Sequence, residues 1–143
     1  MCIIPGVSSA IAVPGCQGIP MTSRGISSSF WVMTATKKEG TFSHDLKYAA
    51  QSSTTMVILM GMRKVEEIVS EVSKYRCSTT PIAIIQNGSL ANETVALSTL
   101  SKTTELLKQI DNSQAGIIVI GDVVAEHPSF FEEEVQRVLY AGF

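Results

Sequence analysis

The sequence predicts an α/β fold, a single domain over residues 1–143 in which a mixed, largely parallel sheet is flanked by helices. Two observations predict it. Short apolar runs recur along the chain, and segments with helical periodicity lie between them, an alternation that is typical of α/β layers. Hydrophobic residues make up 45% of the chain and charged residues 17%, which supports a buried core and excludes a disordered segment.

The expected strands are short, apolar, rich in β-branched residues and bounded by turn-forming residues. They lie at residues 30–33, 56–60, 82–85 and 117–120. Continuous apolarity suits strands that are covered on both faces, as in parallel sheets. Residues 93–98 instead alternate between apolar and polar side chains, which predicts a half-exposed strand at an edge or in an antiparallel pair.

Helices are expected between the strands, where apolar residues recur at helical spacing. One stripe comprises Val65, Ile68, Val69 and Val72, and a second comprises Leu106, Leu107 and Ile110. Near the end, Ser129 and Glu132 fit a capping box. This box predicts a last helix whose apolar face is formed by Phe131, Val135, Val138 and Leu139.

Composition also excludes several functions. The net charge is −2, with no cluster of Lys and Arg, so no nucleic-acid partner is expected. Cys2, Cys16 and Cys77 are far apart and accompanied by only two histidines, so we expect no metal site and interpret the cysteines as reduced, mostly buried thiols of a cytoplasmic protein. Proline and glycine interrupt the apolar start of the chain, which predicts no signal peptide and no membrane span.

Two segments near the amino terminus have the chemistry of binding loops. Pro-Gly-Val-Ser-Ser-Ala at residues 5–10 is a glycine turn that leads into a helix start, where free N–H groups and a hydroxyl can hold a polar ligand group. An ordinary helix cap is the alternative. Gly-Ile-Pro-Met-Thr-Ser-Arg-Gly at residues 18–25 is an extended loop, in which Arg24 can pair with a substrate carboxylate. A surface arginine that pairs with a nearby acidic side chain is the alternative, and residue chemistry alone favours it.

Two further segments directly follow expected strands, at the sheet edge where ligands of α/β proteins collect. Leu-Met-Gly at residues 59–61 places Met60 beside a glycine that permits close approach of a ligand, although a core methionine is the alternative. Gln-Asn-Gly-Ser at residues 86–89 is typical of a tight turn. Since no catalytic triad, carboxylate pair or Walker loop can be assembled, the residues alone predict a ligand-binding domain without visible catalytic machinery.

In order and spacing, these segments resemble the uroporphyrinogen-III C-methyltransferase family of tetrapyrrole methylases. That family has a Pro-Gly-x-(Ser/Thr)-(Ser/Ala)-Ala turn, then Gly-Ile-Pro-x-Thr-His-Arg, strands that end in Met-Gly and in Asn-Gly-(Thr/Ser), and a last strand that leads into Gly-x-Val-Val. The corresponding segments here are 5–10, 18–24, 60–61, 87–89 and 121–124. The resemblance covers residues 3–124 and identifies the chain as the carboxy-terminal domain of such an enzyme.

The resemblance implies a two-domain enzyme with S-adenosylmethionine in the cleft between the domains. The positions that match the family's cofactor contacts are Ser8, Ser9, Met60 and Gly88. Thr22 and Arg24 are the expected substrate-binding residues, although Ser23 stands where the family has histidine. The implied reaction methylates two ring carbons of uroporphyrinogen III and gives precorrin-2 for sirohaem or cobalamin.

The family's amino-terminal Gly-x-Gly-Pro-Gly-Asp loop is absent from the sequence. We therefore expect the amino-terminal domain, with the acid–base catalytic residues, to be missing and the fragment alone to be inactive. A tetrapyrrole substrate and a homodimer are the expected partners. Two alternatives stay open, namely another precorrin methylase and a non-catalytic module that binds a ligand or oligomerises.

Overall fold

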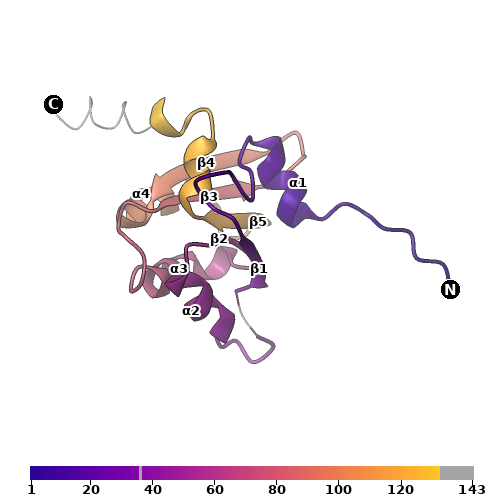
Figure 1. The fold of residues 1–143 in the computed structure, drawn as a ribbon, viewed down its shortest axis with the longest axis horizontal. Coiled ribbons are helices and arrows are strands. Elements are labelled where there is room, and N and C mark those ends of the chain that lie inside the picture. The colour runs from indigo at the N-terminus through magenta and orange to yellow at the C-terminus, as the bar shows by residue number, and fades with distance from the viewer. Residues whose placement is uncertain (36, 133–143) are drawn as a thin grey trace.

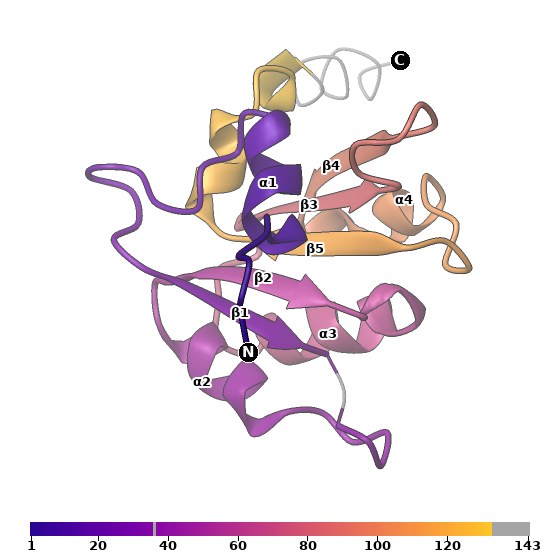
Figure 2. The ribbon, with the colours of Figure 1, turned by 90° about the vertical axis from the view of Figure 1, so that its right-hand side faces the viewer.

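The structure, a computed structural model, describes residues 1–35 and 37–132. Its centre is a five-stranded sheet in the order β1-β2-β5-β3-β4 (Figures 1 and 2). The strands are β1 (Phe30–Thr34), β2 (Thr55–Leu59), β3 (Pro81–Gln86), β4 (Thr94–Thr99) and β5 (Gly116–Ile120). β1 and β2 are parallel, whereas β5 is antiparallel to both of its neighbours and β4 is antiparallel to β3.

Helices cover both faces of this sheet. They are α1 (Ser9–Cys16), α2 (His44–Gln51), α3 (Val65–Val72) and α4 (Thr103–Leu107), with short 3-10 helices η1 (Met62–Lys64), η2 (Leu100–Lys102) and η3 (Asp122–Glu126). Figure 2 shows α1 in front of the sheet and α2, α3 and α4 behind it. This arrangement confirms the predicted α/β fold with flanking helices.

The core has two parts because successive side chains of a strand point to opposite faces of the sheet. In β2, Met56 and Ile58 pack with α2, α3 and α4, whereas Val57 packs with α1 and η3. All three side chains are fully buried. The double coverage explains why the strand sequences are continuously apolar.

The expectation of a largely parallel sheet is wrong, since β1 and β2 form the sheet's single described parallel pair. Burial on both faces makes a strand apolar whichever way it runs, so the apolar runs do not reveal that β5 is reversed. β1, β2 and β3 nevertheless run in one direction, because β2 and β3 are both antiparallel to β5. Their carboxyl ends therefore meet at one edge.

Other expectations about elements have mixed outcomes. β4 is an antiparallel edge strand, as the alternation predicts, but residues 96–99 are buried, so the expected half-exposure is wrong. The apolar stripe of α3 is buried, and Leu106 of α4 is buried with Leu107 and Ile110 packed beside it. A last helix begins at residue 130, but Val135, Val138 and Leu139 lie outside the described residues. The sequence patterns missed α2, whose buried side chains are only Leu46 and two alanines.

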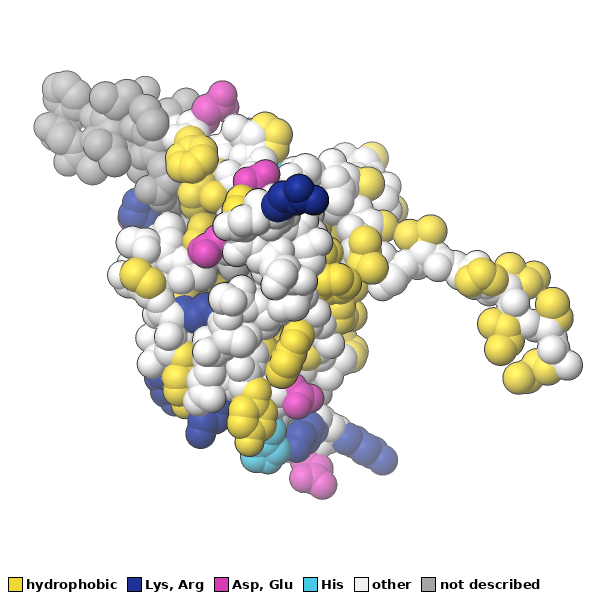
Figure 3. Space-filling model, in the orientation of Figure 1, with side chains coloured by type: hydrophobic (Ala, Val, Ile, Leu, Met, Phe, Trp, Pro, Cys, Tyr) yellow, Lys and Arg dark blue, Asp and Glu magenta, His cyan; other side chains and the backbone are white. Residues whose placement is uncertain are grey.

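The three cysteines are exposed, so the expectation of mostly buried thiols is wrong. Cys2 lies in the extended amino-terminal segment, Cys16 ends α1, and Cys77 lies in the turn after α3. The amino-terminal segment leads away from the body of the molecule (Figure 1). It carries exposed apolar side chains (Figure 3), among them Ile3, Ile4 and Val7. Within the described residues no helix has the length and apolarity to cross a membrane.

Candidate functional site

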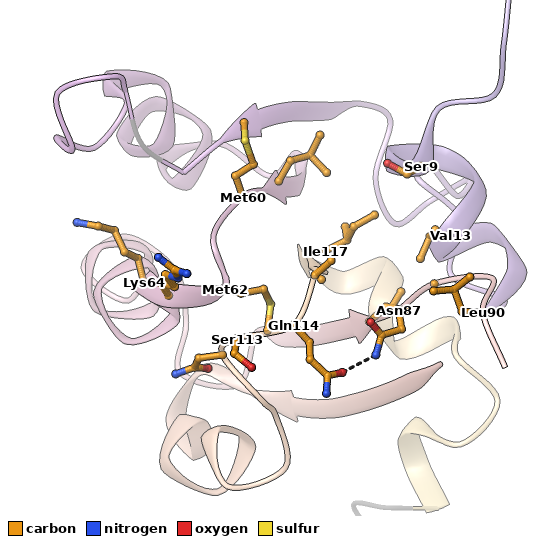
Figure 4. Close-up of a pocket in the computed structure, with 17 residues that line it drawn as sticks. Ser9, Val13, Met60, Met62, Lys64, Asn87, Leu90, Ser113, Gln114 and Ile117 are labelled. Carbon is orange, nitrogen blue, oxygen red and sulfur yellow. Dashed lines mark hydrogen bonds between the residues drawn. The ribbon is translucent and has the colours of Figure 1, made fainter. Parts of the chain in front are cut away.

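A pocket of about 800 Å³, called the main pocket below, opens where the carboxyl ends of β2 and β3 meet (Figure 4). Segments far apart in the sequence form its walls. They are the start of α1, residues 59–64 after β2, residues 87–90 after β3 and residues 112–117 at the start of β5. The site therefore exists only in the folded chain.

Met60 directly follows β2 and lies in the wall formed by residues 59–64. Its backbone takes a left-handed conformation with a φ of 55°, and 75% of the residue is exposed beside the main pocket. The alternative of a core methionine is therefore wrong. A Cβ atom at Gly61 would lie 2.9 Å from Cδ1 of Ile68 and 3.0 Å from Cδ1 of Ile118. Gly61 thus lets the turn pack on the core, and it does not open the backbone to a ligand as expected.

The turn after β3 forms the opposite wall. Asn87 and Ser89 have φ values of 51° and 66°, and the Asn87 amide donates to the side-chain oxygen of Gln114 across the end of the sheet (Figure 4). Between them, a Cβ atom at Gly88 would lie 2.5 Å from Cγ1 of Val13. Because atoms cannot approach so closely, only glycine lets this turn contact α1.

Helix α1 lies against the turn after β3, and its start continues the same wall of the main pocket. Ser8 takes the N-cap position, and its carbonyl accepts from the N–H groups of Ile11 and Ala12 at 3.2 and 3.0 Å. Its hydroxyl makes no capping hydrogen bond, so the alternative of an ordinary helix cap holds for the position of Ser8 but not for its side chain. Ser9 lines the main pocket, whereas Ser8, the preceding residue, does not.

The wall at the start of β5, formed by residues 112–117, depends on Asp111. Its carboxylate accepts from Oγ of Ser113 at 2.6 Å, from the Ser113 N–H at 2.9 Å and from Nε2 of Gln114 at 3.1 Å. These bonds, above all those from Ser113, hold the pKa of Asp111 below its ordinary value of 3.8. The ionised carboxylate thereby fixes the turn that presents Ser113 and Gln114 to the main pocket.

The chemistry of the main pocket favours binding over proton transfer. Apolar side chains such as Val13, Ile85 and Ile117 lie among amides and hydroxyls, with Arg63 and Lys64 also in the lining. None of the lining residues that the structure describes is an aspartate, glutamate, histidine or cysteine. Lys64 is partly engaged, since its Nζ lies 3.3 Å from the Gly40 carbonyl and 3.5 Å from the Glu67 carboxylate. The lining suits a ligand with an apolar part and several polar groups.

Thr22 and Arg24 lie in a second hollow, called the loop hollow, of about 530 Å³. Hydroxyl side chains dominate its lining: Thr22, Ser23, Ser27, Ser28 and Ser53. These residues precede β1 and β2, so the loop hollow is at the opposite ends of those strands from the main pocket. Within the described residues Arg24 forms no ion pair, which disfavours the alternative of a surface arginine bound to a neighbouring acid.

The sequence-predicted cofactor positions Ser9, Met60 and Gly88 thus converge on the main pocket, whereas the fourth predicted position, Ser8, does not line it. Sequence reasoning missed Val13, Leu90 and residues 112–117, which line it too. A parallel β5 would bring its carboxyl end to this edge, whereas the antiparallel β5 brings its start. In residues 1–35 and 37–132 no three histidine, cysteine, aspartate or glutamate side chains gather as metal ligands do.

Comparisons with known proteins show the family to which this chain is related. Residues 2–104 match the profile of the family described as Tetrapyrrole (Corrin/Porphyrin) Methylases. The chain is 38% identical over 124 residues to the uroporphyrinogen-III C-methyltransferase of Methanocaldococcus jannaschii, a match that covers 85% of this chain and 51% of the relative. It is 30% identical over 126 residues to the siroheme synthase of Actinobacillus succinogenes, covering 87% of this chain and 26% of the relative.

Among solved structures, the fold is similar to that of uroporphyrin-III C-methyl transferase from Thermus thermophilus complexed with S-adenyl homocysteine. The TM-score is 0.71 at 25% sequence identity, and the match covers 86% of this chain and 53% of that one. The match therefore spans about half the length of the Methanocaldococcus jannaschii and Thermus thermophilus enzymes.

Proposed function

The chain belongs to the tetrapyrrole methylase family, and on that premise we propose that it is the carboxy-terminal half of a uroporphyrinogen-III C-methyltransferase and forms one wall of its S-adenosylmethionine site. The observation that carries the proposal is the convergence of Ser9, Met60 and Gly88 on the main pocket. These positions match the family's cofactor contacts, and they come from three separate elements.

The lining of the main pocket fits this cofactor. Val13, Ile85 and Ile117 offer an apolar surface to an adenine ring, while Asn87 and Ser113 offer partners for ribose hydroxyls and ring nitrogens. When bound, S-adenosylmethionine supplies one electrophilic methyl group and leaves as S-adenosylhomocysteine, so the complete enzyme would use two cofactor molecules in turn, one for each of the two ring carbons methylated in forming precorrin-2. The chain's own residues bind and orient the cofactor.

The acid–base groups of the reaction are assigned to the amino-terminal half. Two observations support this, namely that the chain spans 51% of the relative's length and that the described lining contains no carboxylate or imidazole. The fragment alone is then inactive. The same lining also favours a second candidate, a ligand-binding module without catalysis.

Substrate recognition is proposed for Thr22 and Arg24, with the guanidinium pairing with a carboxylate of the tetrapyrrole. Because the loop hollow is at the other end of β2, these residues act in the assembled enzyme rather than beside the main pocket of this chain. A homodimer is proposed as that assembly. It is supported by exposed apolar side chains of the edge strand β1, with Phe30, Trp31 and Val32 at 37%, 41% and 46% exposure. The cytoplasmic location stays a prediction.

Two measurements test the proposal. Calorimetry with S-adenosylhomocysteine and this chain is expected to show weak binding, because losing one wall of a cleft can cost on the order of a thousandfold in affinity. No binding at millimolar ligand would contradict the cofactor site. Labelled methyl groups are expected to enter uroporphyrinogen III only after a separately made amino-terminal half is added. Turnover by this chain alone would contradict the proposal that the active site needs both halves of the enzyme. Binding of S-adenosylhomocysteine without turnover, even after the amino-terminal half is added, would favour the non-catalytic module.

A further inference from the structure

The loop of residues 87–93 between β3 and β4 connects two walls of the main pocket. On one side, the Asn87 N–H donates to the Ala115 carbonyl at 3.1 Å, and its side-chain amide donates to Gln114. On the other side, Gly88 lies against Val13 of α1. The van der Waals contact at Gly88 can slide apart, so the hold on α1 needs a directional bond.

Glu93 provides that bond. One oxygen of its half-buried carboxylate accepts from the backbone N–H of Ser89 at 2.6 Å. The other oxygen accepts from the side-chain amide of Gln17, the residue that caps the carboxyl end of α1. A single carboxylate therefore joins the 87–89 turn to a helix more than 70 residues earlier in the chain.

The hydrogen bond from the Ser89 N–H to Glu93 holds a turn whose backbone conformation is unfavourable by itself. Asn87 and Ser89 both have left-handed φ values, a conformation that costs a residue other than glycine about 1 kcal/mol or more. A turn of this kind persists only where surrounding contacts hold it. The carboxylate bond to the Ser89 N–H is charge-assisted, and such bonds are stronger than those between neutral groups.

We propose that Glu93 is a positioning residue, which holds the 87–89 turn against α1 and so sets the distance between the walls that carry Gly88 and Ser9. The effect on cofactor binding rests on the proposed function. Glu93 does not line the main pocket, so it acts through the turn and makes no contact with the ligand.

The test compares variants that keep or remove the two bonds. Glu93→Ala removes both. Glu93→Gln keeps an acceptor for the Ser89 N–H, and a rotated Gln17 amide can accept from the new amide. The double variant Gln17→Glu with Glu93→Gln restores a carboxylate–amide pair, with the carboxylate on residue 17 and the amide on residue 93. Glu105→Ala is the matched control, because it removes an exposed glutamate on α4 away from the main pocket.

Two readouts are measured for each protein, the dissociation constant for S-adenosylhomocysteine and the amide exchange rate of Ser89 by NMR. For Glu93→Ala we expect about tenfold weaker binding, from the loss of two hydrogen bonds, together with faster exchange at Ser89. Glu93→Gln and the double variant keep both hydrogen bonds but make the bond to Ser89 neutral. They should therefore restore most of the affinity that Glu93→Ala loses, to within about threefold of the starting protein. Glu105→Ala should change neither readout.

Unchanged exchange at Ser89 in Glu93→Ala overturns the proposal. Faster exchange with unchanged affinity also overturns it, because the turn would then move without affecting the ligand. The proposal is also overturned if Glu93→Ala weakens binding and both Glu93→Gln and the double variant bind equally weakly. If the unaltered protein fails to bind S-adenosylhomocysteine, the proposed function fails, and exchange at Ser89 still decides whether Glu93 holds the turn.

Discussion

The main pocket and the loop hollow lie at opposite ends of β2 and are built in different ways. Around the main pocket, a Cβ atom at Gly61, Gly88 or Gly116 would lie 2.9, 2.5 or 2.6 Å from a side chain. At Gly25 in the loop hollow, nothing lies within 4 Å of that position. At these three glycines the main pocket therefore depends on close packing against side chains, whereas at Gly25 the loop hollow depends on backbone conformation, with a φ of 80°.

The largest expected difference between the two sites follows from adding one methyl group to a glycine in each. Gly88→Ala should lower the free energy of unfolding by about 1–3 kcal/mol through overpacking against Val13, and S-adenosylhomocysteine should bind at least about tenfold more weakly as a result. Gly25→Ala should cost about 1–2 kcal/mol from its left-handed backbone, with no change in that affinity. Denaturant unfolding and calorimetry measure both quantities.

A compensating change sharpens the interpretation of Gly88. Val13→Ala together with Gly88→Ala removes the two methyl groups that the new Cβ would meet, so much of the lost affinity should return. Gly15→Ala is the control, since nothing lies within 4 Å of its Cβ position. Failure of the double change to recover binding would show that Gly88 is required for another reason.

Substitution of Arg24 separates the two sites by ligand. Arg24→Ala should leave S-adenosylhomocysteine binding unchanged, because the loop hollow and the main pocket share no lining residue. In the complete enzyme, the KM for uroporphyrinogen III should rise about tenfold through the loss of a charge-assisted bond. A change in cofactor affinity instead would place Arg24 at the cofactor, contrary to the geometry.

Met60 tests whether exposed residues of the main pocket serve binding rather than stability. Met60→Ala should change the free energy of unfolding by no more than about 0.5 kcal/mol, as for other exposed residues, while S-adenosylhomocysteine affinity falls about fivefold through lost apolar contact. Met60→Gly should weaken binding equally but stabilise the protein by about 1 kcal/mol, because glycine accepts a φ of 55°. Equal stability of the two variants would contradict the assignment of strain at this residue.

The smallest expected effect is the pH dependence of the Asp111 wall. Because hydrogen bonds lower the folded-state pKa of Asp111, its stabilising contribution is present above the ordinary value of 3.8 and is lost as the pH falls through the folded value. The difference in denaturation midpoint between the unaltered protein and Asp111→Asn should therefore shrink between pH 7 and pH 3. A difference that stays constant would contradict this role.

The sequence was informative wherever a signal depended on local structure. Glycine and asparagine mark the 86–89 turn, and apolar runs mark the strands, so Met60 and Gly88 could be placed at one sheet edge. The direction of β5 leaves no trace in its composition, and residues 112–117 were therefore missed. Val13 and Leu90 were missed too, since a contact between α1 and the 87–93 loop joins residues that no local pattern relates. Whether these residues bind the cofactor is still a prediction.

The place of β5 between β2 and β3 has a consequence for how the protein is made. Strands β1 to β4 all precede β5 in the chain, yet β2 and β3 do not pair with each other and meet only through β5. During synthesis the two halves of the sheet must wait until residue 120 has left the ribosome, a long-range closure that is slow by nature. Nascent chains halted before that point should expose the inner edges of β2 and β3 to chaperones, and pulsed hydrogen exchange should show both strands becoming protected together with β5.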